Sequence, residues 1–431
     1  MNIEQVTTDS LRPYANNART HSRAQIKQIA ASITRFGFTN PILIGNDDQV
    51  IAGHGRLAAA KLLKMEQVPV VRLAGLDAEE RKAYILADNA IAQKAGWDQE
   101  LLAIEFQNLI DANFDMDLTG FSMAEIDLTL DAAKASSIAP DKDDFIPKVP
   151  STPVTRAGDL WLLGRHLLIC GDARDPAVYI RLMGESCADL LFTDPPYNVP
   201  VHGHVCGNGS VKHREFAFAS GEMSNEEFQT FLATALGCTA LFSTASALAY
   251  VFMDWRHMRQ LMDAGDTAFH ELKQLCVWNK TNGGQGTFYR SKHELVFVYQ
   301  VGTETPLNNF GLGQTRYRTN VWDYAGISSI SPTRAADLAM HPTVKPLKLV
   351  VDAIEDSTRR GNIVLDCFAG SGTTVIAADR CGRIARAIEC DPLYCDVIIR
   401  RFQNMTGKGA ILAGTTTSFD RLADERLGVA A

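Results

Sequence analysis

The chain has 431 residues, 46% of them hydrophobic and 21% charged, which is an ordinary globular balance and enough chain for more than one core. No apolar run approaches the roughly 20 residues that a membrane-spanning helix requires, and the net charge of −8 gives the chain as a whole no hint of a polyanionic partner. We therefore expect no membrane association. The first residues lack a signal-peptide pattern, and the nine cysteines form no CxxC pair, which favours a cytoplasmic protein with reduced thiols.

The charge is distributed unevenly along the chain. Residues 1–75 carry nine basic and five acidic side chains. Residues 76–145 carry five basic and sixteen acidic side chains, and residues 278–318 carry five basic and two acidic ones. One acidic segment therefore sets the sign of the whole chain, and two basic regions remain available for phosphate groups.

The first elements form a small module. Hydrophobic residues at helical spacing are followed by short apolar runs that turn signals separate. This pattern predicts a compact α+β domain over residues 1–75. Its expected elements are a helix over residues 22–36, strands over 41–45 and 49–53, a second helix from Gly53 and a strand over 68–73.

The middle of the chain changes in composition. Residues 76–135 are acidic and mostly helical, with Trp97, Leu101, Leu102, Ile104 and Leu109 as candidate packing positions. Residues 136–157 are rich in Pro, Ser and Asp and predict a linker. From residue 158 to 415, apolar strands alternate with helices, which predicts an α/β domain with a mostly parallel sheet. Residues 416–431 are expected to form a tail.

A strand of the large domain ends in an unusual motif. The apolar run over residues 188–192 leads into Asp194, Pro195, Pro196 and Tyr197. Proline cannot continue a helix and lacks the N–H that a central strand donates. The motif therefore presents a carboxylate, rigid backbone carbonyls and an aromatic ring at the end of a strand.

A second motif, NIVLDCFAGSGTT, covers residues 362–374. A buried strand ends at Asp366, a turn with Gly370 and Gly372 follows, and a helix begins. Such a turn lets a ligand approach the backbone above a helix N-terminus, and Glu389 ends the next strand at the spacing of an acid that binds ribose. The third glycine of GxGxxG is missing. The motif thus predicts a nucleoside-bearing cofactor and disfavours a dinucleotide.

The two motifs together resemble the amino-group DNA methyltransferases that use S-adenosylmethionine. The order of TDPPYN, HPTVKP and VLDCFAGSGTT resembles the beta class of these enzymes, over roughly residues 158–410. The resemblance implies the S-adenosylmethionine-dependent methyltransferase fold, a doubly wound and mostly parallel sheet in circularly permuted order. It also implies site-specific methylation of the exocyclic N6 of adenine in double-stranded DNA after base flipping. The catalytic residues that it implies are Asp194, Pro195, Pro196 and Tyr197, and the cofactor-binding residues are Asp172, Thr343, Lys345, Asp366, Phe368, Gly370, Gly372 and Glu389.

The DPPY chemistry has a physical basis. The lone pair of an adenine amine is delocalised into the ring, so the amine is a poor nucleophile. Hydrogen bonds from its N–H groups to Asp194 and to the carbonyl of Pro195 localise that lone pair, and the rigid prolines hold both acceptors in place beforehand. Tyr197 is expected to stack on the flipped base.

The amino-terminal module resembles the ParB/sulfiredoxin-like domain through residues 10–72. The motif GHGR, from Gly53 to Arg56, places an arginine at a helix N-terminus, where a phosphate or nucleotide binds readily. His54 and Leu57 depart from the ParB pattern, so nucleotide hydrolysis is not expected, and a docking module with a capped helix is an equal alternative. ParB-like modules on such methyltransferases are typical of phage and mobile-element proteins. The resemblance is also compatible with a homodimer.

Several alternatives compete with this hypothesis. N4-cytosine methylation is one, although that group usually has Ser in place of Asp194. A second alternative is a non-catalytic ParB-like DNA-binding protein, which the intact motifs disfavour. A third is an NAD-dependent oxidoreductase, which the missing third glycine of GxGxxG disfavours. A zinc site is disfavoured because its ligands are poorly spaced, so no metal is expected. The candidate ligands are His202, His204, Cys206 and His213.

The target-recognition segment is expected within residues 300–340, between YRSKHE and HPTVKP. This segment contains side chains that can read base edges in the major groove, or that can contact only phosphates. They are Gln314, Arg316, Arg318 and Asn320, near Tyr317 and Trp322.

Overall fold

The computed structural model describes residues 2–17, 19–94, 96–112, 114–135, 146–147, 149–199, 219, 221–280, 289–310, 318–325 and 344–428. The chain divides into two compact units, Met1–Ser136 and Ser137–Ala431. Among the described residues, every helix is too short or too polar to cross a lipid bilayer.

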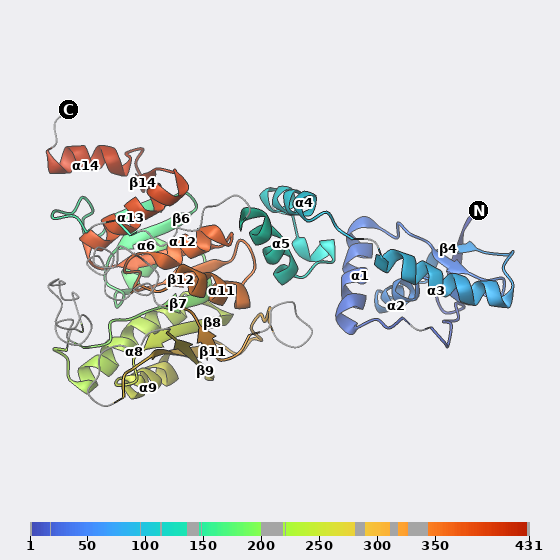
Figure 1. Ribbon diagram of the computed structural model, residues 1–431, viewed down its shortest axis with the longest axis horizontal. Helices are drawn as coiled ribbons and strands as arrows, with labels where there is room; N and C mark the ends of the chain where they lie inside the picture. Colours follow the sequence, from blue (N-terminus) through green and yellow to red (C-terminus); the bar gives the residue numbers. More distant parts are fainter. Residues whose placement is uncertain are drawn as a thin grey trace. The chain divides into compact units, whose positions relative to one another are not determined.

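Unit 1 opens with the expected α+β module. Its sheet has the order β1-β4-β2-β3 and joins β1 (Ile3–Thr7), β4 (Gln67–Arg72), β2 (Ile42–Ile44) and β3 (Val50–Ala52). Helices α1 (Arg23–Phe36) and α2 (His54–Leu62) accompany this sheet (Figure 1). The Ser22 side chain caps α1 by accepting from the backbone N–H of Gln25, and Gly37 ends the helix at φ 81°. Ile42, Ile44, Val50 and Val68 form the core.

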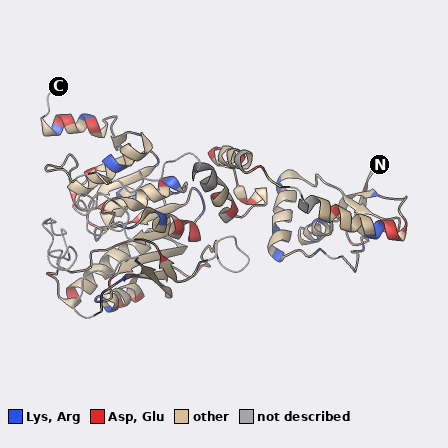
Figure 2. Ribbon diagram, viewed as in Figure 1, with Lys and Arg blue, Asp and Glu red and all other residues tan. Residues whose placement is uncertain are grey.

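The acidic half of unit 1 is helical, as its composition indicates. It contains α3 (Ala78–Lys94), α4 (Gln99–Asp111), the 3₁₀ helix η1 (Met116–Thr119) and α5 (Met123–Ala135), and Asp and Glu outnumber Lys and Arg along them (Figure 2). The predicted packing positions are only partly right. Leu102 and Leu109 pack against a small core with Ala103, Phe106 and Ile126. Trp97, Leu101 and Ile104 are exposed, because α4 turns the face of Ala103 and Phe106 inward instead.

Unit 2 is built on a large sheet that confirms the predicted α/β fold class. Its order is β11-β9-β10-β8-β7-β12-β13-β6-β5-β14, and the central strands from β8 to β6 are all parallel. The strands are β5 (Leu160–Leu163), β6 (His166–Cys170), β7 (Ala188–Thr193), β8 (Ser243–Met253), β9 (Glu271–Asn279), β10 (His293–Gln300), β11 (Val321–Asp323), β12 (Ile363–Asp366), β13 (Ile384–Glu389) and β14 (Ala410–Leu412).

Helices cover both faces of this sheet. Adjacent residues of β7 point to opposite sides, so Leu190 lies in one core and Leu191 in the other. The Leu190 side packs against α11 (Leu347–Ser357), α12 (Thr373–Arg380), α13 (Pro392–Thr406) and α14 (Phe419–Leu427). The Leu191 side packs against α6 (Pro176–Met183), α8 (Asn225–Leu241) and α9 (Met258–Ala268).

The strand order reverses beside β7. From β7 the chain continues through α8 to β8 on one side, whereas β12 leads through α12 to β13 on the other. Ligands of open α/β sheets bind at the carboxyl ends of strands where the order reverses. The DPPY motif follows β7 and the glycine turn follows β12, so both motifs lie at this point.

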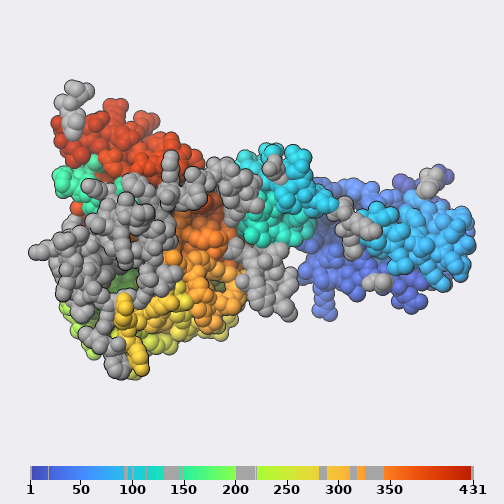
Figure 3. All heavy atoms as spheres, viewed as in Figure 1, coloured from blue at the N-terminus to red at the C-terminus, as the bar shows by residue number. Residues whose placement is uncertain are grey.

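The segments that flank the predicted large domain contribute described residues to the fold of unit 2. Instead of a tail, residues 419–427 form α14, whose Phe419 is buried edge-on against Trp161 at 5.3 Å between ring centroids. Instead of pure linker, Val154 and Thr155 donate backbone N–H groups to the buried Asp396 carboxylate at 2.6 and 3.0 Å. The C-terminal segment, red in Figure 3, covers one end of this unit. Phe419 and Val154 are the apolar anchors that the sequence interpretation overlooked.

Candidate active site

Asp194 lies directly after β7 and is held from both sides. The Tyr197 hydroxyl donates to its Oδ1 at 2.6 Å, and the Lys345 ammonium donates to its Oδ2. Pro195 is buried behind this pair. The structure therefore brings together three residues that lie in two separate sequence motifs.

Glu294 on β10 completes the cluster, and the sequence analysis did not single it out. Its Oε2 lies 3.2 Å from the Tyr197 hydroxyl oxygen and 3.1 Å from the Lys345 ammonium. Lys280, just after β9, donates to the other carboxylate oxygen, Oε1. The motif YRSKHE ends in Glu294, but only the pairing of β10 with β9 shows which side chains Glu294 contacts.

Burial and neighbouring charges set the protonation of this cluster. Burial raises the pKa of Asp194 above its ordinary value, an effect that Lys345 opposes and Glu294 reinforces. Burial also acts to raise the pKa of Glu294, but Lys345 and Lys280 outweigh it and hold that pKa at about 2. The two carboxylates outweigh burial at Lys345 and raise its pKa. Lys345 is thus a buried cation between two acids.

The glycine motif follows β12 as predicted. Asp366 is buried and accepts hydrogen bonds from the Thr374 hydroxyl at 2.6 Å, the Thr193 hydroxyl at 3.0 Å and the Phe368 N–H at 3.1 Å. Burial raises its pKa to about 6. Because Thr193 ends β7, its hydrogen bond ties the glycine motif directly to the DPPY strand.

The turn itself depends on glycine. Gly370 and Gly372 have φ values of 52° and 79°, a region that residues with a side chain rarely adopt. A Cβ on Gly372 would lie 2.8 Å from Cγ2 of Ile398 on α13. The turn therefore brings the backbone close to α13 at the N-terminus of α12.

Glu389 ends β13 beside this turn. Its carboxylate accepts from the backbone N–H groups of Gly370 and Asp391 at 2.8 and 2.9 Å, and burial raises its pKa to about 7. The Phe368 ring lies 5.8 Å from that of Phe231. Both oxygens of Glu389 keep a lone pair that can accept from a ribose hydroxyl.

Asp172 lies two residues after β6, at the same edge of the sheet. The Arg174 guanidinium donates to both of its oxygens and lowers its pKa, and it also lies over the Phe231 ring at 5.4 Å. Thr343 lies outside the described residues. The other predicted site residues therefore follow four neighbouring strands, β6, β13, β12 and β7, except for Lys345, which reaches Asp194 from the start of α11.

The recognition segment differs from expectation where it is described. Arg318 donates to Asp356 at 3.0 Å and to the Tyr324 hydroxyl, and it lies over the Trp322 ring at 5.2 Å. Asn320 donates to the carbonyl of Leu275. Trp322 is thus buried, and Arg318 is a half-buried partner of the acids of α11. Gln314, Arg316 and Tyr317 lie outside the described residues, as do His202, His204, Cys206 and His213.

In unit 1 the GHGR motif opens α2 as predicted. Gly53 has φ 101°, and the His54 Nε2 accepts from the Tyr14 N–H at 3.2 Å. Burial lowers the pKa of both His54 and Arg56. The Nε atom of Arg56 is buried and has no hydrogen-bond partner among the described residues.

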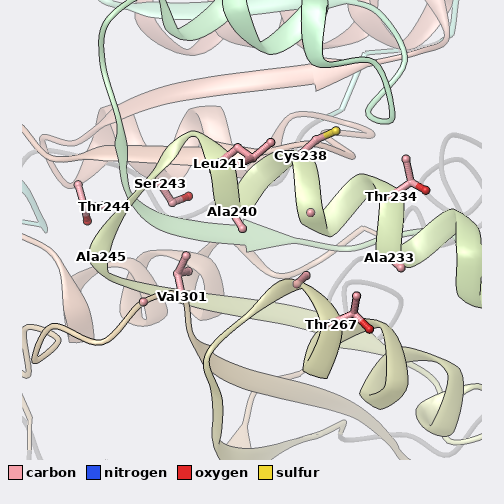
Figure 4. Close-up of a pocket in the computed structure, with 13 residues that line it drawn as sticks. Ala233, Thr234, Cys238, Ala240, Leu241, Ser243, Thr244, Ala245, Thr267 and Val301 are labelled. Atoms are coloured by element: carbon pink, nitrogen blue, oxygen red, sulfur yellow. The ribbon is translucent and has the colours of Figure 1, made fainter.

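Unit 2 also has a separate hollow, shown in Figure 4. It is lined by Thr234, Cys238 and Leu241 of α8, by Ser243 and neighbours at the start of β8, and by Thr267 and Val301. The start of β8 is the opposite edge of the sheet from the DPPY motif. This hollow is therefore not part of the candidate active site.

Comparisons with known proteins divide the chain similarly. A family model described as DNA methylase matches residues 188–400, a ParB N-terminal domain matches residues 1–90, and a ParB-methyltransferase HTH domain matches residues 100–157. The helix-turn-helix match spans segments that the sequence analysis interpreted as acidic helices and linker.

Individual relatives match one part or the other. The ParB-like nuclease domain-containing protein YnaK of Escherichia coli (strain K12) is 54% identical over 72 residues, 17% of this chain and 83% of YnaK. The type II methyltransferase M.HpaI of Haemophilus parainfluenzae is 23% identical over 256 residues, 55% of this chain and 74% of that protein. The solved PvuII DNA methyltransferase (cytosine-N4-specific) is 16% identical, covers 65% of this chain and 94% of its own, and has a TM-score of 0.43.

Proposed function

Because the chain belongs to the N6/N4 DNA methylases that carry an amino-terminal ParB-like domain, we propose that it methylates the exocyclic N6 of adenine at specific sites in double-stranded DNA. The observation that carries the choice of adenine is the aspartate at the first position of DPPY. Asp194 is half-buried and held by Tyr197 and Lys345 at the end of β7. The N4-cytosine methyltransferases that carry this motif usually have serine in place of Asp194.

The methylase family implies S-adenosylmethionine as the methyl donor, and the residues after β12 and β13 fit it. Glu389 is fixed by two backbone N–H groups and can accept from both ribose hydroxyls. The positive φ values of Gly370 and Gly372 let the methionine part approach the backbone. When bound, the cofactor supplies a methyl group on a positively charged sulfur.

The residues of the DPPY motif act on the target base. The amine of a flipped base donates to Asp194 and to the carbonyl of Pro195, which localises its lone pair toward the methyl group. The prolines fix both acceptors before the base arrives, so little reorganisation remains during transfer. Asp194 need not accept the proton of the methylated amine, because the product ammonium is acidic enough to lose that proton to water.

The test is to identify the methylated base. DNA from cells that express the protein is digested to nucleosides for mass spectrometry, and the same DNA is sequenced to locate the marks. We expect N6-methyladenine at a defined sequence, and at least about a hundredfold less from Asp194→Ala, which loses the preorganised acceptor but keeps cofactor affinity. N4-methylcytosine alone would refute the choice of base, and wild-type turnover of Asp194→Ala would refute the role of Asp194.

We also propose that the ParB-like module binds a phosphate-bearing ligand at Gly53–Arg56. The support is the left-handed Gly53 at the start of α2 together with the buried Arg56 Nε. Calorimetric titration of the full chain with CTP and with inorganic phosphate tests this site. We expect binding of at least one of them that Arg56→Met abolishes. No binding of either would favour a docking role.

A further inference from the structure

Four charged side chains form a continuous row at the target-base side of the site. The order is Lys280, Glu294, Lys345 and Asp194, in which each neighbouring pair shares a hydrogen bond or ion pair. The two middle members of the row are the most buried. The Lys280 and Asp194 side chains at its ends are 30% and 22% exposed, whereas those of Lys345 and Glu294 are 6% and 14% exposed.

The Tyr197 hydroxyl joins the two acids of this row. It donates toward Asp194 at 2.6 Å and lies 3.2 Å from Glu294. Two carboxylates that share one hydroxyl in a buried site repel each other, and both stay ionised only if cations compensate them. Lys345 lies between them, and Lys280 supplies the second positive charge.

Aromatic rings enclose the Lys345 ammonium. It lies 4.9 Å from the centroid of Phe252, 5.8 Å from Tyr197 and 5.9 Å from Trp278. These rings come from β8, the DPPY motif and β9, so the sheet itself positions the cation. Ring faces attract an ammonium, and the cation is therefore held in place on Asp194.

We propose that Lys345 and Glu294 are positioning residues with opposite effects on Asp194, and that Lys280 completes their charge balance. Lys345 keeps Asp194 ionised and oriented so that a lone pair remains for the target amine. Glu294 holds Lys345 there and, by its own charge, works against the ionisation of Asp194. This inference rests on the proposed role of Asp194 as the acceptor of the target amine.

The surroundings of Asp194 support these opposite signs. Burial raises its pKa most, then Lys345 lowers it and Glu294 raises it. Asp366 also faces it across Thr193 and senses its charge. Among the described residues, Lys345 is the cation adjacent to Asp194, and the hydrogen bond from the Tyr197 hydroxyl also lowers the pKa of Asp194.

A different role for Lys345 follows from the family resemblance, which assigns it to the methionine carboxylate of the cofactor. The two roles make separate predictions. If Lys345 binds the cofactor, its replacement weakens S-adenosylmethionine binding at every pH. If Lys345 compensates the charge of Asp194, its replacement shifts the pH at which Asp194 ionises and leaves cofactor affinity nearly unchanged.

The experiment measures single-turnover transfer of labelled methyl groups from saturating S-adenosylmethionine to unmethylated bacterial genomic DNA between pH 5 and 9. At low pH the rate should fall as Asp194 becomes protonated, and this part of the pH profile is the acidic limb. In Lys345→Met the acidic limb should shift to a pH that is higher by about one unit or more, because Asp194 loses its cation. In Glu294→Gln the limb should lie at or below that of the wild type. The double variant should return the limb toward the wild type, since both opposing charges are gone.

Matched controls come from an exposed pair on β9. Lys273 and Glu271 form an ion pair at 3.0 Å with side chains 41% and 53% exposed, so Lys273→Met and Glu271→Gln should leave the limb in place. If Lys345→Met does not fold, Lys280→Met takes its place, and its acidic limb should shift to higher pH by a smaller amount. Lys345→Arg keeps the charge and should keep the wild-type limb.

Two results would overturn the proposal. One is a Lys345→Met limb that coincides with the wild type, together with weakened cofactor binding. The other is a double variant whose limb moves further up than that of Lys345→Met. A wild-type product of N4-methylcytosine would instead refute the proposed base, and the limb would still be readable because the assay counts methyl groups on either amine.

Discussion

Single carboxylates at this sheet edge differ in charge because their surroundings differ. Asp172 has an arginine partner and a lowered pKa, whereas Glu389 accepts from two backbone N–H groups and the Cys390 thiol, and burial raises its pKa to about 7. Because Glu389 is proposed to bind ribose through its ionised carboxylate, the affinity for ribose should change near neutral pH. Asp172 should not contribute to that change.

This difference gives a prediction at Glu389. Adenosine affinity should rise roughly tenfold from about pH 6 to 8, because the ionised carboxylate accepts from both ribose hydroxyls while the protonated form competes as a donor. Glu389→Gln should bind more weakly and without this pH dependence. Calorimetric titration with adenosine measures both, and an unchanged slope in the variant would contradict the assignment.

The same shift predicts the stability of the free protein. The pKa of Glu389 rises from 4.5 to about 7 on folding, so its stabilising contribution is complete below about pH 4.5 and is lost as the pH rises through about 7. The melting temperature of Glu389→Gln relative to wild type should therefore be higher at pH 8 than at pH 5. Equal differences at both pH values would argue against a buried, protonated Glu389.

At the scale of elements, the turn between β12 and α12 depends on a close helix contact. Gly372→Ala should destabilise unit 2 by about 1–3 kcal/mol and weaken cofactor binding, since the new Cβ combines positive φ with a contact of 2.8 Å to Ile398. Gly407→Ala is the matched control, with φ 68° and open space around its Cβ. Urea denaturation should show a clearly larger loss for Gly372→Ala than for Gly407→Ala.

The same elements show what the sequence could predict. The turn after β12 and the DPPY end of β7 follow from local signals, namely glycine, proline and a buried run before them. Glu294 and Lys280 carried no such signal, because their roles arise from the pairing of β9 with β10. Arg318 was interpreted as a DNA-reading side chain, since nothing local reveals that the acids of α11 lie opposite it.

The contacts of Arg318 with Asp356 and Tyr324 predict a role in the stability of unit 2. Arg318→Met should lower the free energy of unfolding by about 3 kcal/mol, because it removes an ion pair of Asp356, whose side chain is 3% exposed. Lys348→Met removes a 73% exposed partner of Asp352 on the same helix and should cost much less. Urea denaturation of both variants compares the losses. Equal losses, or an altered set of methylated sites in a stable Arg318→Met protein, would restore the recognition role.

At the scale of the whole molecule, the net charge of one segment does not fit the DNA-binding role that its family model suggests. Residues 100–157 match a helix-turn-helix domain of ParB-methyltransferases, yet they carry eleven acidic and four basic side chains, a net charge of −7. Phosphate contacts supply much of the affinity of DNA-binding proteins, and they require cations. The exposed Lys292, in the basic region of unit 2 between residues 278 and 318, is better suited to that role.

Salt dependence separates these two surfaces. Lys292→Gln, between β9 and β10, should reduce the slope of log affinity against log salt by about one, as expected when one phosphate interaction is removed. Glu105→Gln combined with Asp111→Asn on α4 should leave both slope and affinity unchanged, because acids more than about 10 Å from the duplex are screened at physiological salt. Fluorescence anisotropy with a labelled duplex between about 50 and 300 mM salt measures both. A gain in affinity for the α4 variant would show that this acidic domain lies against the DNA after all, since removing negative charge there would relieve repulsion.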